Sequence, residues 1–377
     1  MRLIIDENLP FTQDFFGDTA ELVHLPGAAF TAAAVKDADG LLVRSVTQVN
    51  QQLLQGSRVG FVGTATIGVD HVDQHWLQQA GIRFVNAPGC NADSVVDYVI
   101  SSLLWLAAEQ GFVLRDQCIG IVGVGQVGGR LAKRLQAYGC RTLLNDPPRV
   151  AQGETGFVEL HSLLGSADIV CLHTPLHREG DYPSWHLIGE PELELLQGKV
   201  LLNAGRGAVV DQQALKQALA KGKAPLLLLD VFEGEPTLDA ELINQCLLAT
   251  PHIAGYSLEG KSRGSEMIYQ AWCDFIGRPA RIALADLLPA SPIAQLQLDA
   301  SCGVEEACRR AAHLCYSPLN DGWRLLQALN TGRPSEQVYQ LLRKHYPVRR
   351  EFSSLRVSAA TLEQTSALSA LGFTLKS

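Results

Sequence analysis

The stretch CIGIVGVGQVG at residues 118–128 decides the fold class of this chain. Its first five residues form a short apolar run, and the next six read Gly-x-Gly-x-x-Gly at the start of a segment, 127–138, with helical periodicity. A strand, a glycine-rich turn and a helix in this order are typical of dinucleotide-binding units. In such a unit Gly123 permits the tight turn, Gly125 lets the backbone approach a pyrophosphate, and Gly128 allows close helix packing.

The acidic residue that such a unit needs for a ribose is also present. Asp146 lies 18 residues after Gly128, at the end of the next apolar run. A carboxylate there accepts hydrogen bonds from a ribose diol and repels a 2′-phosphate, so the sequence favours NAD over NADP as cofactor. Arg149 argues the other way, because an arginine accommodates that phosphate. The alternative is a glycine-rich turn beside an unrelated loop aspartate.

Strand-like runs and helical segments alternate on both sides of this motif, which predicts parallel sheets covered by helices. We expect an α/β fold with two doubly wound parallel-sheet domains and a small C-terminal α+β domain. The predicted domains are residues 1–93 with 257–285, 94–256, and 286–377. Strands are expected at residues 2–5, 21–24, 40–44, 59–63 and 83–86, then at 118–122, 142–145, 168–173, 200–203 and 226–230. Long helices are expected at 95–110, capped by Asp93-Ser94, and at 261–276, and shorter ones at 305–315, 322–329 and 336–345.

Composition excludes several classes of function. The chain has 377 residues, 19% of them charged, and a formal net charge of −8. This balance argues against nucleic acid or an anionic membrane as a partner, because both require a clustered positive field. No apolar run is long enough to span a bilayer, the N-terminus does not read as a signal peptide, and the nine cysteines form no Cys-x-x-Cys pair. We therefore expect a cytoplasmic protein.

Three polar clusters follow later strands, at the edge where an open α/β sheet binds its ligand. Arg206 lies between two glycines, Glu233 and Glu235 follow the leucine run at 226–229, and His252 follows the run at 247–249. Taken alone, Arg206 could be a solvated turn residue and the glutamates a plain acidic loop, and a lone histidine such as His252 is more often a core or surface residue than a catalyst. Together they supply a guanidinium for a carboxylate, a carboxylate to orient an imidazole, and a base that titrates near neutral pH. Oxidation of a 2-hydroxy acid by a nicotinamide cofactor needs this set.

The chain resembles the D-isomer-specific 2-hydroxyacid dehydrogenase family over about residues 1–285, through the glycine motif and the segments 203–207, 230–236 and 251–255. The resemblance implies that Arg206 binds the substrate carboxylate, Glu235 orients the histidine, and His252 transfers the proton. It also implies cofactor contacts from Gly123, Gly125, Gln126, Val127, Gly128, Asp146, Thr174, Ala204, Asp230 and Gly255.

The segments 62–71, 86–92 and 252–263 and the tail after Pro289 resemble one branch of this family, whose substrate is a small phosphorylated 2-hydroxy acid and whose tail forms a homodimer. Such a substrate needs anion sites at both ends. Thr66 and Arg206 are expected at the carboxylate, Arg44 and Ser45 at the phosphate, and Tyr256 closes the site. Arg349 or Arg350 is a further candidate for the phosphate.

Other readings stay open. The substrate could be that of another family member, 3-phosphoglycerate or hydroxypyruvate, or the chain could be a non-enzymatic NAD-sensing protein or bind some other nucleotide. No metal site is expected: His71 and His75 are four residues apart, but no third ligand accompanies them.

Overall fold

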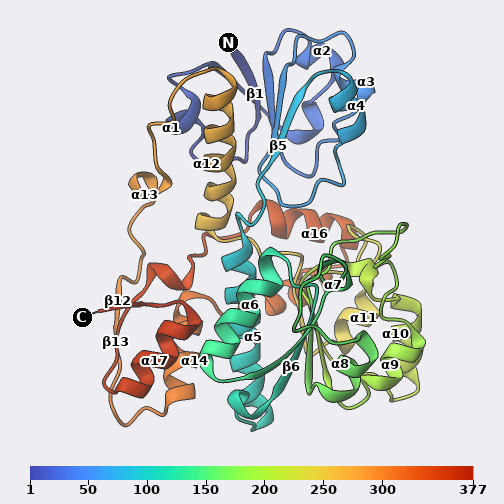
Figure 1. Ribbon diagram of the computed structural model, residues 1–377, viewed down its shortest axis with the longest axis vertical. Helices are drawn as coiled ribbons and strands as arrows, with labels where there is room; N and C mark the ends of the chain where they lie inside the picture. Colours follow the sequence, from blue (N-terminus) through green and yellow to red (C-terminus); the bar gives the residue numbers. More distant parts are fainter. Residues whose placement is uncertain (377) are drawn as a thin grey trace. The chain divides into compact units, whose positions relative to one another are not determined.

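The structure, a computed structural model, describes residues 1–376 (Figure 1). It divides into two compact units, one made of residues 1–92 with 257–290 and the other of residues 93–256 with 291 onward. The second unit thus combines the segment expected to bind the dinucleotide with the C-terminal residues. Whether residues 286–377 act as a domain of their own remains a prediction.

The first unit is a five-stranded sheet in the order β2-β1-β3-β4-β5, and every pair of neighbours is parallel. Its strands are β1 (Arg2–Asp6), β2 (Glu21–Leu25), β3 (Gly40–Val43), β4 (Phe61–Thr64) and β5 (Arg83–Asn86). Its helices are α1 (Thr12–Phe16), α2 (Ala32–Val35), α3 (Gln51–Leu54), α4 (Gln74–Gln79), α12 (Leu258–Phe275) and α13 (Leu284–Leu287).

Helix α12 returns the chain to this first sheet, as the sequence predicts. Ser257 caps its N-terminus by accepting a hydrogen bond from Gly260 N. Trp272 is fully buried and meets the Phe61 ring edge-on at 5.4 Å. The apolar face of α12 therefore covers one side of the sheet, as expected because parallel sheets are buried on both faces.

The second unit contains six parallel strands in the order β11-β10-β9-β8-β6-β7. They are β6 (Cys118–Val122), β7 (Arg141–Asn145), β8 (Ile169–Leu172), β9 (Val200–Asn203), β10 (Leu226–Leu229) and β11 (Leu248–Ala249). The helices are α5 (Ala92–Gln110), α6 (Gln126–Tyr138), α7 (Pro147–Ala151), α8 (Leu160–Ser166), α9 (Glu190–Leu195), α10 (Gln212–Ala220) and α11 (Ala240–Gln245). Because β7 and β8 flank β6 on opposite sides, the order reverses at β6, and ligands of open α/β sheets bind at such a reversal.

The C-terminal residues form a parallel sheet of β12 (Gln295–Gln297), β13 (Arg356–Ser358) and β14 (Thr374–Leu375). Helices α14 (Val304–Cys315) and α17 (Leu362–Leu371) pack against each other, and α17 contacts β14. Helices α15 (Pro318–Leu329) and α16 (Ser335–Lys344) pack together, and α15 contacts β11 of the six-stranded sheet. Arg134 of α6 pairs with Asp97 of α5 at 2.7 Å and donates to the carbonyl of Leu371 at 3.0 Å, while Phe352 N donates to the same aspartate at 2.8 Å. The C-terminal residues therefore share a hydrophobic core with the rest of the second unit, and their backbone hydrogen-bonds to both members of this ion pair.

The α/β fold class with two parallel sheets and a small C-terminal sheet is confirmed, but three details of the prediction were wrong. Helix α5 starts at Ala92, so Asp93 and Ser94 lie in its first turn and not at the cap. Helix α17 was not expected, and the sixth strand β11 corresponds to the apolar run 247–249 before His252, which was not counted among the strands of the second sheet.

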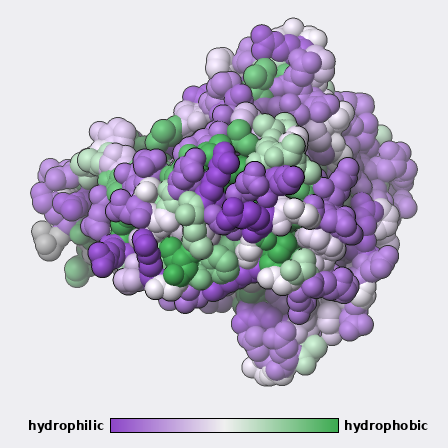
Figure 2. All heavy atoms as spheres, turned by 90° about the horizontal axis from the view of Figure 1, so that it is seen from above, coloured by the Kyte–Doolittle hydropathy of each residue, from purple (hydrophilic) through white to green (hydrophobic). Residues whose placement is uncertain are grey.

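No helix among the described residues has the length and apolar character needed to cross a bilayer. Figure 2 shows one face of the molecule, on which hydrophilic side chains predominate and apolar ones form small patches.

Candidate active site

The ends of β9, β10 and β11 lie next to one another in the second unit. Asp230 N donates to the carbonyl of Asn203 at 2.9 Å, and His252 N donates to the carbonyl of Asp230 at 2.7 Å. The loops that follow these strands carry Arg206, Glu235 and His252. The topology thus brings three separate sequence clusters to one edge of the sheet.

Glu235 and His252 are in direct contact. Glu235 Oε2 lies 2.8 Å from His252 Nδ1, and its other oxygen accepts a hydrogen bond from Phe232 N at 2.8 Å. His252 has a φ of 56°, in the left-handed region that residues with a Cβ seldom adopt. The backbone is thus held in an unfavourable conformation at the residue predicted to transfer a proton.

The charge on Glu235 is stabilised by its neighbours. Burial alone raises the pKa of this carboxyl, but His252, the Tyr339 hydroxyl and Phe232 N outweigh it, and the pKa ends below its ordinary value. Glu235 is therefore ionised at neutral pH and accepts the hydrogen of Nδ1. The neutral imidazole then carries its lone pair on Nε2, which is the nitrogen available as a base.

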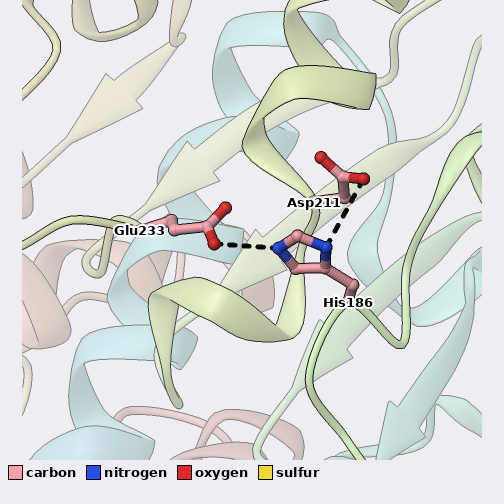
Figure 3. Close-up of side chains that lie close together, drawn as sticks. All are labelled: His186, Asp211 and Glu233. Atoms are coloured by element: carbon pink, nitrogen blue, oxygen red, sulfur yellow. Dashed lines mark hydrogen bonds and ion pairs between the residues drawn. The ribbon is translucent and has the colours of Figure 1, made fainter.

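The second glutamate of this loop has a different partner. Glu233 lies 2.8 Å from His186 Nε2, and Asp211 lies 3.5 Å from His186 Nδ1 (Figure 3). Such a group has the composition of a metal site, yet each ring nitrogen already meets a carboxylate. The geometry thus distinguishes two glutamates between which the sequence does not choose: Glu233 pairs with His186, and Glu235 pairs with His252.

The loop that carries Arg206 is fixed by its own residues. The Asn203 side chain donates to the carbonyl of Arg206 at 3.0 Å and accepts from Gly205 N at 3.0 Å. A Cβ on Gly207 would lie 2.0 Å from the carbonyl carbon of Phe232, so only glycine allows this loop to lie against the Glu235 loop. Arg206 therefore lies in a well-ordered turn that packs against the Glu235 loop.

Asp230, expected to contact the cofactor, also has a structural role. Its buried carboxylate accepts hydrogen bonds from Thr250 Oγ1 at 2.6 Å, Ile253 N at 2.9 Å and Ala254 N at 2.9 Å. Burial raises the pKa of this carboxyl despite those bonds. Asp230 thus clamps the segment that holds His252 in its left-handed conformation, and its contact with a cofactor remains a prediction.

The glycine loop has the shape that a dinucleotide requires. Gly123 has a φ of 84°, a Cβ on Gly128 would lie 2.0 Å from the Gly123 carbonyl oxygen, and a Cβ on Gly125 would meet no protein atom. Gln126 begins α6, so the N–H groups of Gln126 and Val127 belong to the first turn and have no partner within the helix. Gly125 is thus free of protein contacts on the side where a phosphate would approach.

Asp146 stays close to this loop. Its carboxylate accepts a hydrogen bond from Val124 N at 2.7 Å and caps α7 through Arg149 N. Arg149 faces Glu154, with Nε 2.9 Å from Oε1, and donates to the Val124 carbonyl at 2.7 Å. Because Glu154 neutralises this guanidinium, Arg149 is poorly placed to favour NADP.

Two buried polar side chains beside the loop lack a protein partner among residues 1–376. They are the Thr174 hydroxyl and the His173 ring, which follow β8. Burial lowers the pKa of His173 to about 4, so the ring is neutral. Orphaned polar atoms at the reversal point of the sheet suit a polar ligand. Ala204 and Gly255, the remaining predicted cofactor residues, follow β9 and β11 at the same edge.

The predicted anion-binding residues of the first unit occupy the ends of its strands. Arg44 Nε pairs with the buried Asp6 at 2.9 Å, and Ser45 beside it is exposed. Thr66 Oγ1 donates to the Gly68 carbonyl at 2.8 Å. The pair with Asp6 fixes the arginine through Nε alone, so its two terminal nitrogens can face an anion.

The C-terminal residues reach the site in a way that the sequence did not indicate. Tyr339 donates to Glu235 at 2.7 Å, and Arg343 donates to Tyr256 at 3.0 Å. Arg349 is buried and donates to the carbonyl of Ser94 at 3.0 Å and to that of Ala254, which contradicts the expectation that Arg349 binds a substrate phosphate. No motif marks Tyr339, which lies about 100 residues from its partner.

Comparison with known proteins identifies the family. Residues 98–254 match the family described as D-isomer specific 2-hydroxyacid dehydrogenase, NAD binding domain. The chain is 47% identical over 99% of both chains to the erythronate-4-phosphate dehydrogenase of Proteus mirabilis, and 48% identical over 99% of both to that of Edwardsiella ictaluri. The chain belongs to the D-isomer-specific 2-hydroxyacid dehydrogenases. Like other members of this family it is an NAD-dependent dehydrogenase, so the predictions of enzyme class and cofactor are confirmed.

Solved structures of other proteins confirm the fold. A Thermus thermophilus protein superposes with a TM-score of 0.62 at 27% identity and covers 75% of this chain and all of its own. The D-lactate dehydrogenase of Aquifex aeolicus gives a TM-score of 0.60 at 23% identity and covers 74% of this chain and 96% of its own. Residues 287–372 match a separate family described as a domain of unknown function.

Proposed function

We propose that this dehydrogenase oxidises 4-phospho-D-erythronate at C2 to 2-oxo-3-hydroxy-4-phosphobutanoate, a step of pyridoxine biosynthesis, in the cytoplasm. The observation that carries the proposal is the Glu235–His252 pair at 2.8 Å, held at the strand ends of an NAD-binding sheet. The names of the relatives supply the substrate. In this proposal residues 1–93 with 257–285 bind the substrate, 94–256 bind NAD, and 286–377 form the dimer.

Each catalytic side chain has one task. His252 Nε2 accepts the proton of the C2 hydroxyl, and Glu235 keeps Nδ1 protonated and stabilises the imidazolium that forms. Arg206 binds the substrate carboxylate through charge-assisted hydrogen bonds. When bound, NAD supplies the acceptor for the hydride that leaves C2. Gly123, Gly125, Gly128 and Asp146 hold this cofactor, together with the backbone of Gln126 and Val127.

The phosphate distinguishes this substrate from those of other family members. We assign it to Arg44 and Ser45, because Asp6 fixes Arg44 through Nε and leaves the outer edge of the guanidinium for an anion. Thr66 and Tyr256 complete the substrate contacts in this proposal. If the assignment holds, a substrate without the phosphate should lose more activity than a phosphorylated substrate with a different number of carbon atoms. Arg44→Gln should lose most of its preference for phosphorylated substrates.

The test of the function is turnover. Formation of NADH from 4-phospho-D-erythronate should require His252, and His252→Ala should abolish it while NAD affinity stays nearly unchanged. If His252→Ala instead kept its turnover and bound NAD more weakly, His252 would be a cofactor-binding residue and not the proton acceptor. If neither 4-phospho-D-erythronate nor another 2-hydroxy acid is oxidised while NAD binds tightly, the chain is a sensor and the proposal fails.

The homodimer is proposed from the C-terminal residues. Leu319 and Trp323 lie one turn apart on α15 and are 38% and 64% exposed, so one helix face presents two large apolar side chains. A second copy of the chain would cover them. In sedimentation experiments the unmodified chain should then be a dimer and Trp323→Glu a monomer. If both form dimers of equal stability, this helix face is not the dimer interface.

A further inference from the structure

Helix α16 contacts the segments that carry the catalytic pair at three points along its length. At its start the Ser335 hydroxyl accepts a hydrogen bond from Leu238 N at 3.0 Å, three residues after Glu235. One turn later the Tyr339 hydroxyl donates to Glu235 at 2.7 Å, and in the next turn Arg343 Nε donates to the Tyr256 hydroxyl at 3.0 Å. Residues four apart share a face of a helix, so Tyr339 and Arg343 present one polar edge to the site.

The Tyr339 hydroxyl has a fixed direction. Arg343 Nη1 lies 2.7 Å from the hydroxyl oxygen, and a guanidinium can only donate, so the hydroxyl must accept there. Its own hydrogen then goes to Glu235 Oε2, while His252 Nδ1 lies 3.4 Å away. Tyr339 is 4% exposed, so water cannot readily replace this bond. Burial, and then the charge of Glu235, raise the pKa of Tyr339, which keeps it a donor.

One carboxylate oxygen therefore serves two donors. Glu235 Oε2 accepts from both the Tyr339 hydroxyl and His252 Nδ1. The tyrosine fixes the rotation of the carboxyl group, and it also withdraws electron density from the oxygen that faces the imidazole. Without the tyrosine the carboxylate would be less restrained and a stronger acceptor, so the imidazolium would be stabilised more and lose its proton less readily.

We propose that Tyr339, held by Arg343, is a positioning residue of the active site: it orients Glu235 and limits the basicity that Glu235 confers on His252. The proposal rests on the proposed function, because it assumes that His252 accepts the substrate proton. It makes the C-terminal residues a part of the catalytic machinery, in addition to any role in dimerisation.

The charged and titratable groups around the Glu235–His252 pair come from three elements. Asp230 follows β10, Tyr256 follows β11, and Tyr339 and Arg343 lie on α16. His252 interacts electrostatically with Asp230 as well as with Glu235. Conversion of Tyr339 to phenylalanine removes one neutral hydroxyl and leaves all these charges in place, so a change in titration reports on the hydrogen bond.

The experiment compares Tyr339→Phe with Tyr316→Phe in the full-length chain. Tyr316 is a matched control because it is also buried, lies among the C-terminal residues and donates to a carboxylate, that of Asp321 at 3.0 Å. In Tyr339→Phe we expect kcat to fall about three- to tenfold and the acid limb of the kcat/KM profile to move up by about 0.5–1 pH unit, with KM for NAD unchanged. Tyr316→Phe should alter neither kcat nor the pH profile, and thermal unfolding checks that both variants fold.

A second measurement separates this proposal from the proposed function. The pKa of His252, followed by NMR of the ring and assigned by difference with His252→Gln, should rise in Tyr339→Phe whether or not the histidine is catalytic. Within Glu235→Gln, the further change Tyr339→Phe should have little effect on the rate, because the tyrosine acts through that carboxylate. An unshifted His252 pKa, or an equal loss of activity in both tyrosine variants, would overturn the positioning role. A shifted pKa with full activity in His252→Ala would instead overturn the proposed function.

Discussion

Replacement of Glu235 by glutamine tests the assignment of the two loop glutamates. The change keeps the shape of the side chain and removes the anion that lies 2.8 Å from His252 Nδ1. A hydrogen bond to a charged group contributes about 1.5–3 kcal/mol, and about 1.4 kcal/mol corresponds to a factor of ten. We therefore expect kcat/KM to fall roughly 10- to 150-fold if that interaction forms fully only with the imidazolium.

The pH dependence gives the sign of the effect. Loss of the carboxylate disfavours the imidazolium, so the acid limb of the kcat/KM profile should move to lower pH. The assay is initial-rate NADH absorbance across the pH range with 4-phospho-D-erythronate as substrate. Calorimetry of NAD binding should show an unchanged affinity, because Glu235 has no assigned cofactor contact.

Glu233→Gln is the matched control, since it lies in the same loop and pairs with a different histidine, His186. It should change kcat/KM by less than about twofold. Equal losses in the two variants would show that the loop as a whole, and not the His252 pair, carries the effect. Full activity in Glu235→Gln would refute the reasoning outright.

Three further outcomes follow from the cofactor side of the site. Asp146→Ala should weaken NAD binding and reduce the preference for NAD over NADP, measured as the ratio of the two kcat/KM values. An unchanged ratio would contradict the proposed contact of Asp146 with the ribose. Gly128→Ala should destabilise the fold by about 1–3 kcal/mol in denaturant titrations and abolish NAD binding, because its Cβ would lie 2.0 Å from the Gly123 carbonyl oxygen. His173 has a folded pKa of about 4, below its unfolded value of 6.5, so the unfolded chain binds the extra proton and stability falls as pH drops from about 6.5 to 4. His173→Asn should remove about 2 kcal/mol of the stability difference between pH 7 and pH 5. An unaltered difference would show that the ring takes up a proton as readily in the folded chain as in the unfolded chain.

The sequence was sufficient for the parallel sheets because each strand is a short apolar run between helical segments. The inner strands, such as β3, β4, β6, β8 and β9, are buried on both faces, so their apolar composition alone marks them. The two-residue strand β11 was not counted among the strands of the second sheet, because Leu248 and Ala249 are too short a run to show a period. Helix α17 was missed because the buried face of LEQTSALSAL at 362–371 includes the polar Gln364 while Leu362 is exposed, so the apolar residues do not mark a single helix face.

The candidate site was predictable only in part. Strand ends of a parallel sheet meet at one edge, so the clusters at Arg206, Glu235 and His252 could be expected to approach one another. Sequence could not choose between Glu233 and Glu235, because the choice depends on which histidine each side chain meets. The contact of Tyr339 depends on how α16 packs on the sheet, and no local pattern encodes that.

The most direct test of the account is a comparison of 4-phospho-D-erythronate with 3-phosphoglycerate, each with NAD and then with NADP, in the unmodified chain and in His252→Ala. The account predicts fast NADH formation from 4-phospho-D-erythronate with NAD, much slower turnover in the other three combinations, and none in His252→Ala. A preference for 3-phosphoglycerate, or turnover that survives the loss of the imidazole, would contradict it.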